Sequence, residues 1–255
     1  MQAVNRVTVC PVAPKDEVFY SRDMPESVMV ISLGGSIIAP DGVDVPFLRS
    51  FHGLVGERMA ADPRLKLIIV CGGGGLARDY QAALREVIPD SRSEDLDWVG
   101  VAATRVNGEL LRRVLRTWCV EDLVTDPSAV TVFAGRILVA AGWKPGFSTD
   151  NDAVVLAQRF SAGTVINLSN ISKVYSDDPK KNPAAKPIDR LTWKEMRAIV
   201  GEEWTPGKNT PFDPTAARAA AQSGIRVIFA EGRNLHNLAE ILAGREFVGT
   251  TIGPD

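Results

Sequence analysis

Short apolar runs alternate with amphipathic segments along the whole chain. Residues 28–33 (VMVISL) are rich in β-branched side chains and end at two glycines, a pattern typical of a buried strand. Comparable runs predict further strands at 65–71, 137–141, 164–168, 225–230 and 247–252. Apolar residues at helical spacing predict helices at 47–59, 76–87, 95–118, 153–160, 192–201, 211–223 and 235–242. This alternation indicates an α/β protein with a mostly parallel central sheet covered on both faces, a three-layer α/β/α fold.

The length and composition are those of an ordinary globular protein. The 255 residues suffice for one sizeable domain or for two small lobes that share a sheet. Hydrophobic residues make up 45% of the chain, charged residues make up 24%, and the formal net charge is −2. A chain without excess positive charge is not expected to bind nucleic acid or an anionic membrane. Any phosphate site must therefore be local, built from backbone N–H groups and a few basic side chains.

The start of the chain and the cysteines bear on the cellular compartment. Residues 1–26 carry acids among prolines and lack the basic-then-apolar pattern of a signal peptide. We interpret them as an N-terminal extension outside a core domain at 27–255, with a contact between subunits as the alternative. No stretch approaches the ~20 apolar residues that cross a bilayer. Cys10, Cys71 and Cys119 form no CxxC pair, and an odd number of thiols suits a reduced, cytoplasmic protein.

Two glycine-rich segments follow predicted strands. Gly34, Gly35 and Ser36 come directly after the first strand, where glycines let the backbone approach a ligand, although two glycines after a strand more often form a plain tight turn. Residues 72–75 are four consecutive glycines between a strand and a helix that carries Arg78 one turn in. A turn needs only one or two glycines, and a helix N-terminus preceded by glycines is suited to bind phosphate. Neither segment matches the GxxxxGK[ST] pattern of a P-loop.

Two further polar segments lie at the ends of later strands. Residues 142–150 (GWKPGFSTD) hold a lysine, two hydroxyls and an acid before a helix, which Ser148 or Thr149 could also cap. Ser169 and Asn170 follow the next strand, and an aromatic ring at Tyr175 could stack on a base. An ordinary surface turn is the alternative for this last segment. Since ligands of parallel sheets bind at the carboxyl ends of strands, all four segments are candidates for one site.

The residues around these segments resemble one family. The runs VISLGGS, IIVCGGGGLARDY, AAGWKPGFSTDNDA, VYSDDPKKNPAAKPI and FDPTAARAAAQSGIRVI, with the ending GTTI, resemble the archaeal-type uridylate (UMP) kinases over residues 28–253. The resemblance implies the amino-acid-kinase fold, with an N-terminal acceptor lobe, a C-terminal ATP lobe and assembly into homo-hexamers. It also implies ATP as the phosphoryl donor, UMP as the acceptor and Mg²⁺ held mainly by ATP oxygens, with no dedicated metal site in the protein.

The resemblance assigns roles to individual residues. Gly34, Gly35 and Ser36 match the loop beside the transferring phosphates, and Asp150 and Asp213 match acids that organise the catalytic centre. The remaining ATP contacts match Gly74, Arg78, Ser169, Asn170, Tyr175 and Asp178. The UMP contacts match Gly73, Asp97 (at the ribose), Trp143, Lys144, Pro145, Gly146, Phe147, Ser148 and Thr149.

The sequence also departs from the family pattern. Ser32 stands where many amino-acid kinases have a lysine, although archaeal-type UMP kinases can lack it. The usual T-N-x-D-G-V-Y motif is replaced by residues 169–175 (SNISKVY), which lose the acid and the glycine and gain Lys173. Trp143 and Phe147 are bulkier than expected in an acceptor loop. These differences leave the nucleotide and the acceptor open.

The proposed chemistry needs positive charge and leaves three alternatives. Arg78 and one of Lys144, Lys173 or Lys208 would neutralise the transferred phosphoryl group, and Lys208 is a candidate because it is near Asp213 in sequence, although it could equally be a solvated loop lysine. One alternative is a kinase of the same fold with another small acceptor. A second is a non-catalytic nucleotide-binding or oxyanion-binding storage protein. A metal-dependent hydrolase is disfavoured because the sequence has no His/Asp/Glu ligand cluster.

Overall fold

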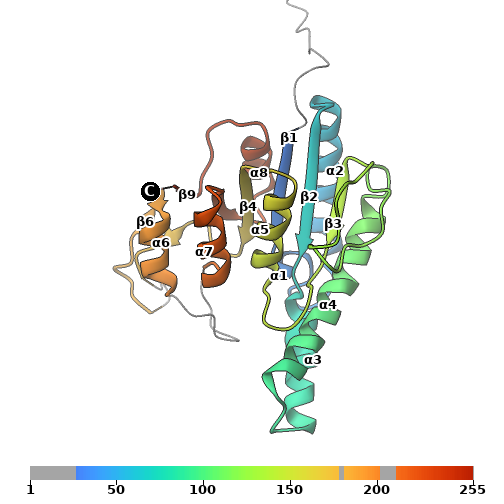
Figure 1. Ribbon diagram of the computed structural model, residues 1–255, viewed down its shortest axis with the longest axis vertical. Helices are drawn as coiled ribbons and strands as arrows, with labels where there is room; N and C mark the ends of the chain where they lie inside the picture. The colour runs from blue at the N-terminus through green and yellow to red at the C-terminus, as the bar shows by residue number, and fades with distance from the viewer. Residues whose placement is uncertain (1–26, 178–180, 202–210, 255) are drawn as a thin grey trace, which may run out of the picture.

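The computed structural model describes residues 27–177, 181–201 and 211–254. A seven-stranded sheet in the order β3-β2-β1-β4-β8-β9-β7 forms its centre (Figure 1). All neighbouring strands run parallel except β8 and β9. The strands are β1 (Ser27–Leu33), β2 (Leu65–Cys71), β3 (Ile137–Ala140), β4 (Thr164–Ser169), β7 (Arg190–Thr192), β8 (Arg226–Glu231) and β9 (Thr250–Gly253). The predicted mostly parallel sheet is confirmed.

Helices cover both faces of the sheet, which confirms the three-layer arrangement. One core is built with α1 (Gly35–Ile38), α2 (Val45–Ala61), α4 (Ser93–Val114) and α8 (Leu235–Leu242). The opposite core is built with α5 (Thr149–Arg159), α6 (Trp193–Val200) and α7 (Pro214–Gln222). The remaining helix, α3 (Gly74–Val87), packs along α4, and the two project as a hairpin beyond the end of the sheet (Figure 1).

The apolar strands explain why the sheet is buried on both sides. In β2, Leu67 and Ile69 pack into the first core, whereas Ile68 and Val70 pack into the second, and all four are fully buried. Successive side chains of a strand point to opposite faces, so a continuous apolar run is what a doubly covered strand requires. Cys71 and Cys119 are free thiols, and both are buried in this interior. Cys10 lies outside the described residues.

Several element boundaries differ from the prediction. Residues 35–38 form a short helix where only a loop was expected, and α5 begins four residues early because the Ser148 hydroxyl accepts a hydrogen bond from the Asn151 N–H. The long helix begins at Ser93 and ends at Val114 rather than spanning 95–118. Between β4 and α6, where no strand was predicted, the structure has β5 (Val174–Tyr175) and β6 (Pro187–Ile188), which form a separate antiparallel pair, and β7 of the main sheet. None of the helices in the described part of the chain is long and apolar enough to cross a membrane.

Candidate active site

The two glycine segments touch backbone to backbone at the carboxyl ends of β1 and β2. A Cβ atom placed on Gly35 would lie 2.1 Å from the Gly74 nitrogen, and one on Gly72 would lie 2.4 Å from the Gly35 nitrogen. The Gly72 N–H donates to the carbonyl of Leu33 at 3.0 Å, which continues the pairing of the two strands into the loops. Gly74 also has a φ of +64°, a conformation that residues with a Cβ rarely adopt. The glycines are therefore required by this contact.

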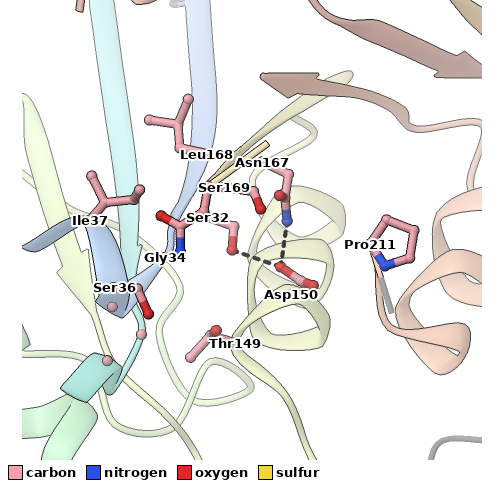
Figure 2. Close-up of a pocket in the computed structure, with 14 residues that line it drawn as sticks. Ser32, Gly34, Ser36, Ile37, Thr149, Asp150, Asn167, Leu168, Ser169 and Pro211 are labelled. Carbon is pink, nitrogen blue, oxygen red and sulfur yellow. Dashed lines mark hydrogen bonds between the residues drawn. The ribbon is translucent and has the colours of Figure 1, made fainter. Parts of the chain in front are cut away.

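A polar cavity of about 240 Å³ opens beside these loops. Its walls come from the ends of β1, β2 and β4 and from the start of α5, and Figure 2 shows their side chains around one space. Eight of the predicted site residues line it: Gly34, Gly35, Ser36, Gly74, Thr149, Asp150, Ser169 and Asn170. Segments separated by more than one hundred residues thus form one site, as their positions at strand ends predicted.

A partly buried carboxyl group joins three of the cavity walls. Asp150 Oδ1 accepts hydrogen bonds from the Ser32 hydroxyl at 2.8 Å and from the Asn167 side-chain amide at 2.7 Å (Figure 2). Ser32 belongs to β1, Asn167 to β4 and Asp150 to the first turn of α5. Ser32, at the position where a lysine is common, is thus a neutral hydrogen-bond donor to this acid.

The surroundings of Asp150 favour its protonated form. Burial raises its pKa to about 6, and the nearby Asp213 carboxylate also raises it, although the hydrogen bonds from Ser32, Asn167 and the Asp213 backbone N–H lower it. A raised pKa means that the ionised carboxylate costs folding free energy above that pH. Such a shifted acid in a polar cavity is a common feature of functional sites.

The second predicted catalytic acid has a local structural role. Asp213 caps α7, since one of its carboxylate oxygens accepts hydrogen bonds from the N–H groups of Thr215 at 2.6 Å and Ala216 at 3.0 Å. Pro211, just before it, lines the cavity. The capped helix therefore begins next to the site. Lys208 and Asp178 lie outside the described residues.

Arg78 connects α3 to the first glycine loop. Its guanidinium donates to the Ser36 hydroxyl at 2.9 Å and to the Pro40 carbonyl at 3.0 Å. The side chain is thus directed at the loop that borders the cavity, from the position one turn into α3 that the sequence indicated. A direct contact of Arg78 with phosphate stays a prediction.

The loop from Gly142 to Ser148 lies beside the cavity and is fixed by both neighbouring helices. From α4, the Thr104 hydroxyl accepts the Gly142 N–H at 2.8 Å, and Asp97 Oδ2 accepts the Gly146 N–H at 3.0 Å. Asp97 lies inside α4, which begins at Ser93 with Arg92 as its N-cap, so Asp97 does not cap this helix. The structure therefore places Asp97 against the loop with which it was predicted to act.

Two half-buried aromatic rings and an exposed lysine lie together in this loop. The rings of Trp143 and Phe147 lie 4.9 Å apart between centroids. The Lys144 ammonium lies 3.9 Å from the centre of the Trp143 ring and 4.9 Å from that of Phe147. Cation–π attraction holds the ammonium there. The two bulky residues that depart from the family pattern thus pack around the lysine between them.

The other predicted residues lie further from the cavity. Gly73 is the N-cap of α3, and a Cβ there would meet the Ala77 side chain at 2.6 Å, so Gly73 faces helices α3 and α4. Tyr175 ends β5 in the small antiparallel pair and is not among the cavity-lining residues of the described chain. The extra charge at Lys173 is paired with the Asp189 carboxylate.

Some residues of the site were not predicted. Ser32 and Asn167 are polar side chains inside apolar strands, near their carboxyl ends, and that pattern could have identified them. Asp152 lies in the first turn of α5, next to the loop, and could have been identified as a second acid in the first turn of this helix. Three apolar residues of the cavity wall carry no such signal in the sequence: Ile37, Leu168 and Pro211.

Known proteins match the chain over most of its length. The model described as the amino acid kinase family matches residues 27–231. A uridylate kinase from Methanospirillum hungatei is 35% identical over 88% of this chain and 94% of its own length, and one from Thermoplasma volcanium is 37% identical over 90% and 98%. The crystal structure of uridylate kinase from Archaeoglobus fulgidus matches with a TM-score of 0.75 and 30% identity, covering 88% of this chain and 99% of that chain.

The glycine contact makes a prediction about stability. Gly35→Ala should lower the free energy of unfolding by roughly 1–3 kcal/mol, because the new Cβ overlaps backbone atoms that cannot rotate away. Gly53→Ala is the matched control, since it lies inside α2 with open space around it and should stabilise the protein by roughly 0.5–1 kcal/mol. Urea unfolding measures both. A Gly35→Ala protein as stable as the wild type would mean that the two loops are not in contact.

The raised pKa of Asp150 predicts a pH-dependent gain in stability. Above pH 6 the wild type contains a partly desolvated carboxylate, so Asp150→Asn should unfold at a higher temperature at pH 8, and the difference should shrink as the pH falls through 6 towards 4. Asp44 gives the opposite control, because its hydrogen bonds from the Phe47 N–H and Arg233 lower its pKa. Asp44→Asn should be less stable than the wild type at pH 8, with the difference shrinking at low pH. Thermal unfolding that shows Asp150→Asn destabilised at every pH would contradict the assignment.

Proposed function

The chain belongs to the amino acid kinase family, and we propose that it is a uridylate kinase that transfers the γ-phosphoryl group of ATP to UMP. The observation that carries the proposal is the convergence on one polar cavity of two glycine loops, the start of α5 and the end of β4. The activity named for its relatives needs a site of this kind, where two nucleotides present their phosphates to each other.

The donor side of the proposed site is built around the cavity. Gly34, Gly35, Ser36 and Gly74 would face the ATP phosphates. The N–H groups of Gly35, Ser36 and Gly74 begin α1 and α3, have no partners within their helices and can donate to anionic oxygens, whereas the Gly34 N–H donates to the Leu168 carbonyl and holds the loop against β4. Ser169 and Asn170 would continue this side towards the nucleoside. Arg78 would hold the first loop through Ser36 and add positive charge. Tyr175 and Asp178 remain proposed contacts by resemblance.

The acceptor side is proposed to consist of loop 142–148 and the side chains that support it, together with Gly73 and Thr149. Asp97 uses one carboxylate oxygen for the Gly146 N–H, which leaves the other oxygen available to accept from a ribose hydroxyl. Lys144, between Trp143 and Phe147, would place a positive charge near the UMP phosphate. The remaining loop members, Pro145, Gly146 and Ser148, would set the shape of this edge of the site.

Phosphoryl transfer needs positioning and charge neutralisation more than covalent chemistry by the protein. Backbone N–H groups of Gly35 and Ser36 would stabilise the charge that develops on the transferred group. Asp150, held by Ser32 and Asn167, would orient the start of α5 between donor and acceptor. Asp213 would act beside it, and Lys208 is the proposed further cation.

The residues of the site fit a magnesium ion carried by ATP. No group of three or more His, Cys, Asp or Glu side chains able to hold a metal occurs in the described ranges, so the protein would supply few ligands and the ATP oxygens most of them. Among the described residues, Asp150 is the one carboxylate on the cavity wall. When bound, the ion would neutralise charge between the β- and γ-phosphates.

The family resemblance carries the proposals about organisation and location. We place the acceptor lobe in the N-terminal part of residues 27–255 and the ATP lobe in the C-terminal part, in a homo-hexamer in the cytoplasm whose ligands are small nucleotides. The net charge of −2 is the reason for proposing neither a nucleic acid nor a membrane as a partner. The storage-protein alternative rested on the altered motif after β4. Ser169 and Asn170 of that motif still line the cavity, and the Lys173 charge is paired, so nothing favours it.

A coupled assay of ADP release tests the proposed function. With ATP and Mg²⁺, the protein should turn over UMP far faster than CMP or AMP, because the acceptor loop is expected to select the base and the monophosphate together. Asp150→Asn serves as the control for contaminating kinases, since it should remove most of the turnover. Equal rates with the three monophosphates, or none with UMP, would refute the proposal.

A further inference from the structure

Asp152 is a buried acid that the proposed mechanism does not use. It lies in the first turn of α5, two residues after Asp150, and is fully buried. Its Oδ2 accepts the Trp143 N–H at 3.1 Å, at the start of loop 142–148. Its Oδ1 is buried without a hydrogen-bond partner. An unsatisfied carboxyl oxygen in the interior costs free energy, so packing alone does not account for this side chain.

The contact of Asp152 differs from the other supports of the loop. Thr104, Arg105 and Asp97 all reach the loop from α4, and the Arg105 guanidinium donates to the Trp143 carbonyl at 2.9 Å. The segment from β3 to α5 accordingly passes beside α4 (Figure 1). The Trp143 N–H that Asp152 accepts belongs to the peptide unit between Gly142 and Trp143. The carbonyl of this unit accepts a bond from Arg105 Nε at 3.4 Å on the α4 side, and Asp152 attaches the unit to α5. The peptide is thus clamped between two helices.

The geometry of α5 links this clamp to the cavity. Residues two positions apart on a helix point about 200° away from each other. Asp150 accordingly faces Ser32 and Asn167, whereas Asp152 faces Trp143. One helical turn therefore contacts the phosphate-side cavity with one acid and the loop with the other. A shift of the loop would be transmitted to the position of Asp150.

We propose that Asp152 is a positioning residue that ties the acceptor loop to the first turn of α5, so that the loop and Asp150 keep one relative geometry. The inference rests on the proposed function, since it assigns the loop to UMP. Asp152 itself touches neither nucleotide. Its loss should therefore weaken UMP binding and leave ATP binding nearly unchanged, because the glycine loops on the ATP side are held by other contacts.

The charged groups around Asp152 are compatible with a hydrogen bond to Trp143 that does not require the Asp152 carboxyl group to be ionised. Burial raises the pKa of Asp152 to about 7, the Trp143 N–H lowers it, and the acids Asp150, Asp213 and Asp126 raise it further. The basic group nearest the clamp in the hydrogen-bond network is Arg105, which bonds to carbonyl oxygens of the loop. A carbonyl-type oxygen accepts the Trp143 N–H whether the carboxyl is protonated or ionised. An amide at this position should therefore replace it.

Three variants test the tie by kinetics. Asp152→Leu keeps the number and branching of the side-chain heavy atoms but removes the acceptor, so the KM for UMP should rise roughly tenfold, the scale of one lost buried hydrogen bond, while the KM for ATP stays within about twofold. Asp152→Asn should restore the KM for UMP to within about threefold of the wild type. Gln158→Ala, on the same helix but bonded to Ser223, should change neither KM. If Asp152→Leu does not fold, the same two KM values are measured for Asp152→Ala, which also removes the acceptor.

Hydrogen–deuterium exchange provides a readout that does not depend on UMP turnover. Peptides covering 142–148 should exchange faster in Asp152→Leu than in the wild type, and Asp152→Asn should exchange like the wild type. An equal rise in both KM values, an Asn variant as impaired as the Leu variant, or unchanged exchange would overturn the tie. If the wild type does not phosphorylate UMP, the proposed function fails, while the exchange comparison still decides whether Asp152 holds the loop.

Discussion

The backbone contact between Gly35 and the glycines at 72–74 is the constraint on which the site depends. Adjacent parallel strands bring their carboxyl ends together, but side chains would normally keep the following loops apart. Here a Cβ on either side would overlap main-chain atoms at 2.1 to 2.4 Å, so the approach exists only between glycines. The contact places the N-termini of two helices at one edge of the sheet. Phosphate binding without an excess of basic residues becomes feasible there, in agreement with the net charge of −2.

The start of α5 is the second organising feature, because it holds one fully buried acid, Asp152, and one partly buried acid, Asp150. Burial raises the pKa of both Asp150 and Asp152, and neither is paired with a basic side chain in the hydrogen bonds of the described chain. Such groups reduce stability at neutral pH. Their partners are instead neutral donors from β1, from β4 and from the Trp143 peptide. The first turn of one helix thus fixes both the cavity wall and the acceptor loop at a cost in folding free energy.

Most of the fold and half of the site follow from the sequence for a physical reason. Apolar runs that end in glycine identify parallel strands, and parallel strands place their carboxyl ends together, so the meeting of Ser36, Gly74, Asp150 and Asn170 could be predicted. The hydrogen bonds between side chains of different strands could not be predicted. The bonds from Ser32 and Asn167 to Asp150 depend on strand order, β2-β1-β4, which no local pattern encodes. The helix at 35–38 was missed because its four residues, GSII, are too few to show a helical period.

The central claim is that donor and acceptor meet across the cavity beside the glycine contact, and a bisubstrate ligand tests it most directly. Titration calorimetry with adenosine and uridine joined through a chain of phosphates should give a Kd at least roughly 100-fold lower than that of ATP or UMP alone, because one ligand would engage both halves of the site. A Kd no lower than that of the better single nucleotide would show that the two halves are not adjacent and would contradict the account.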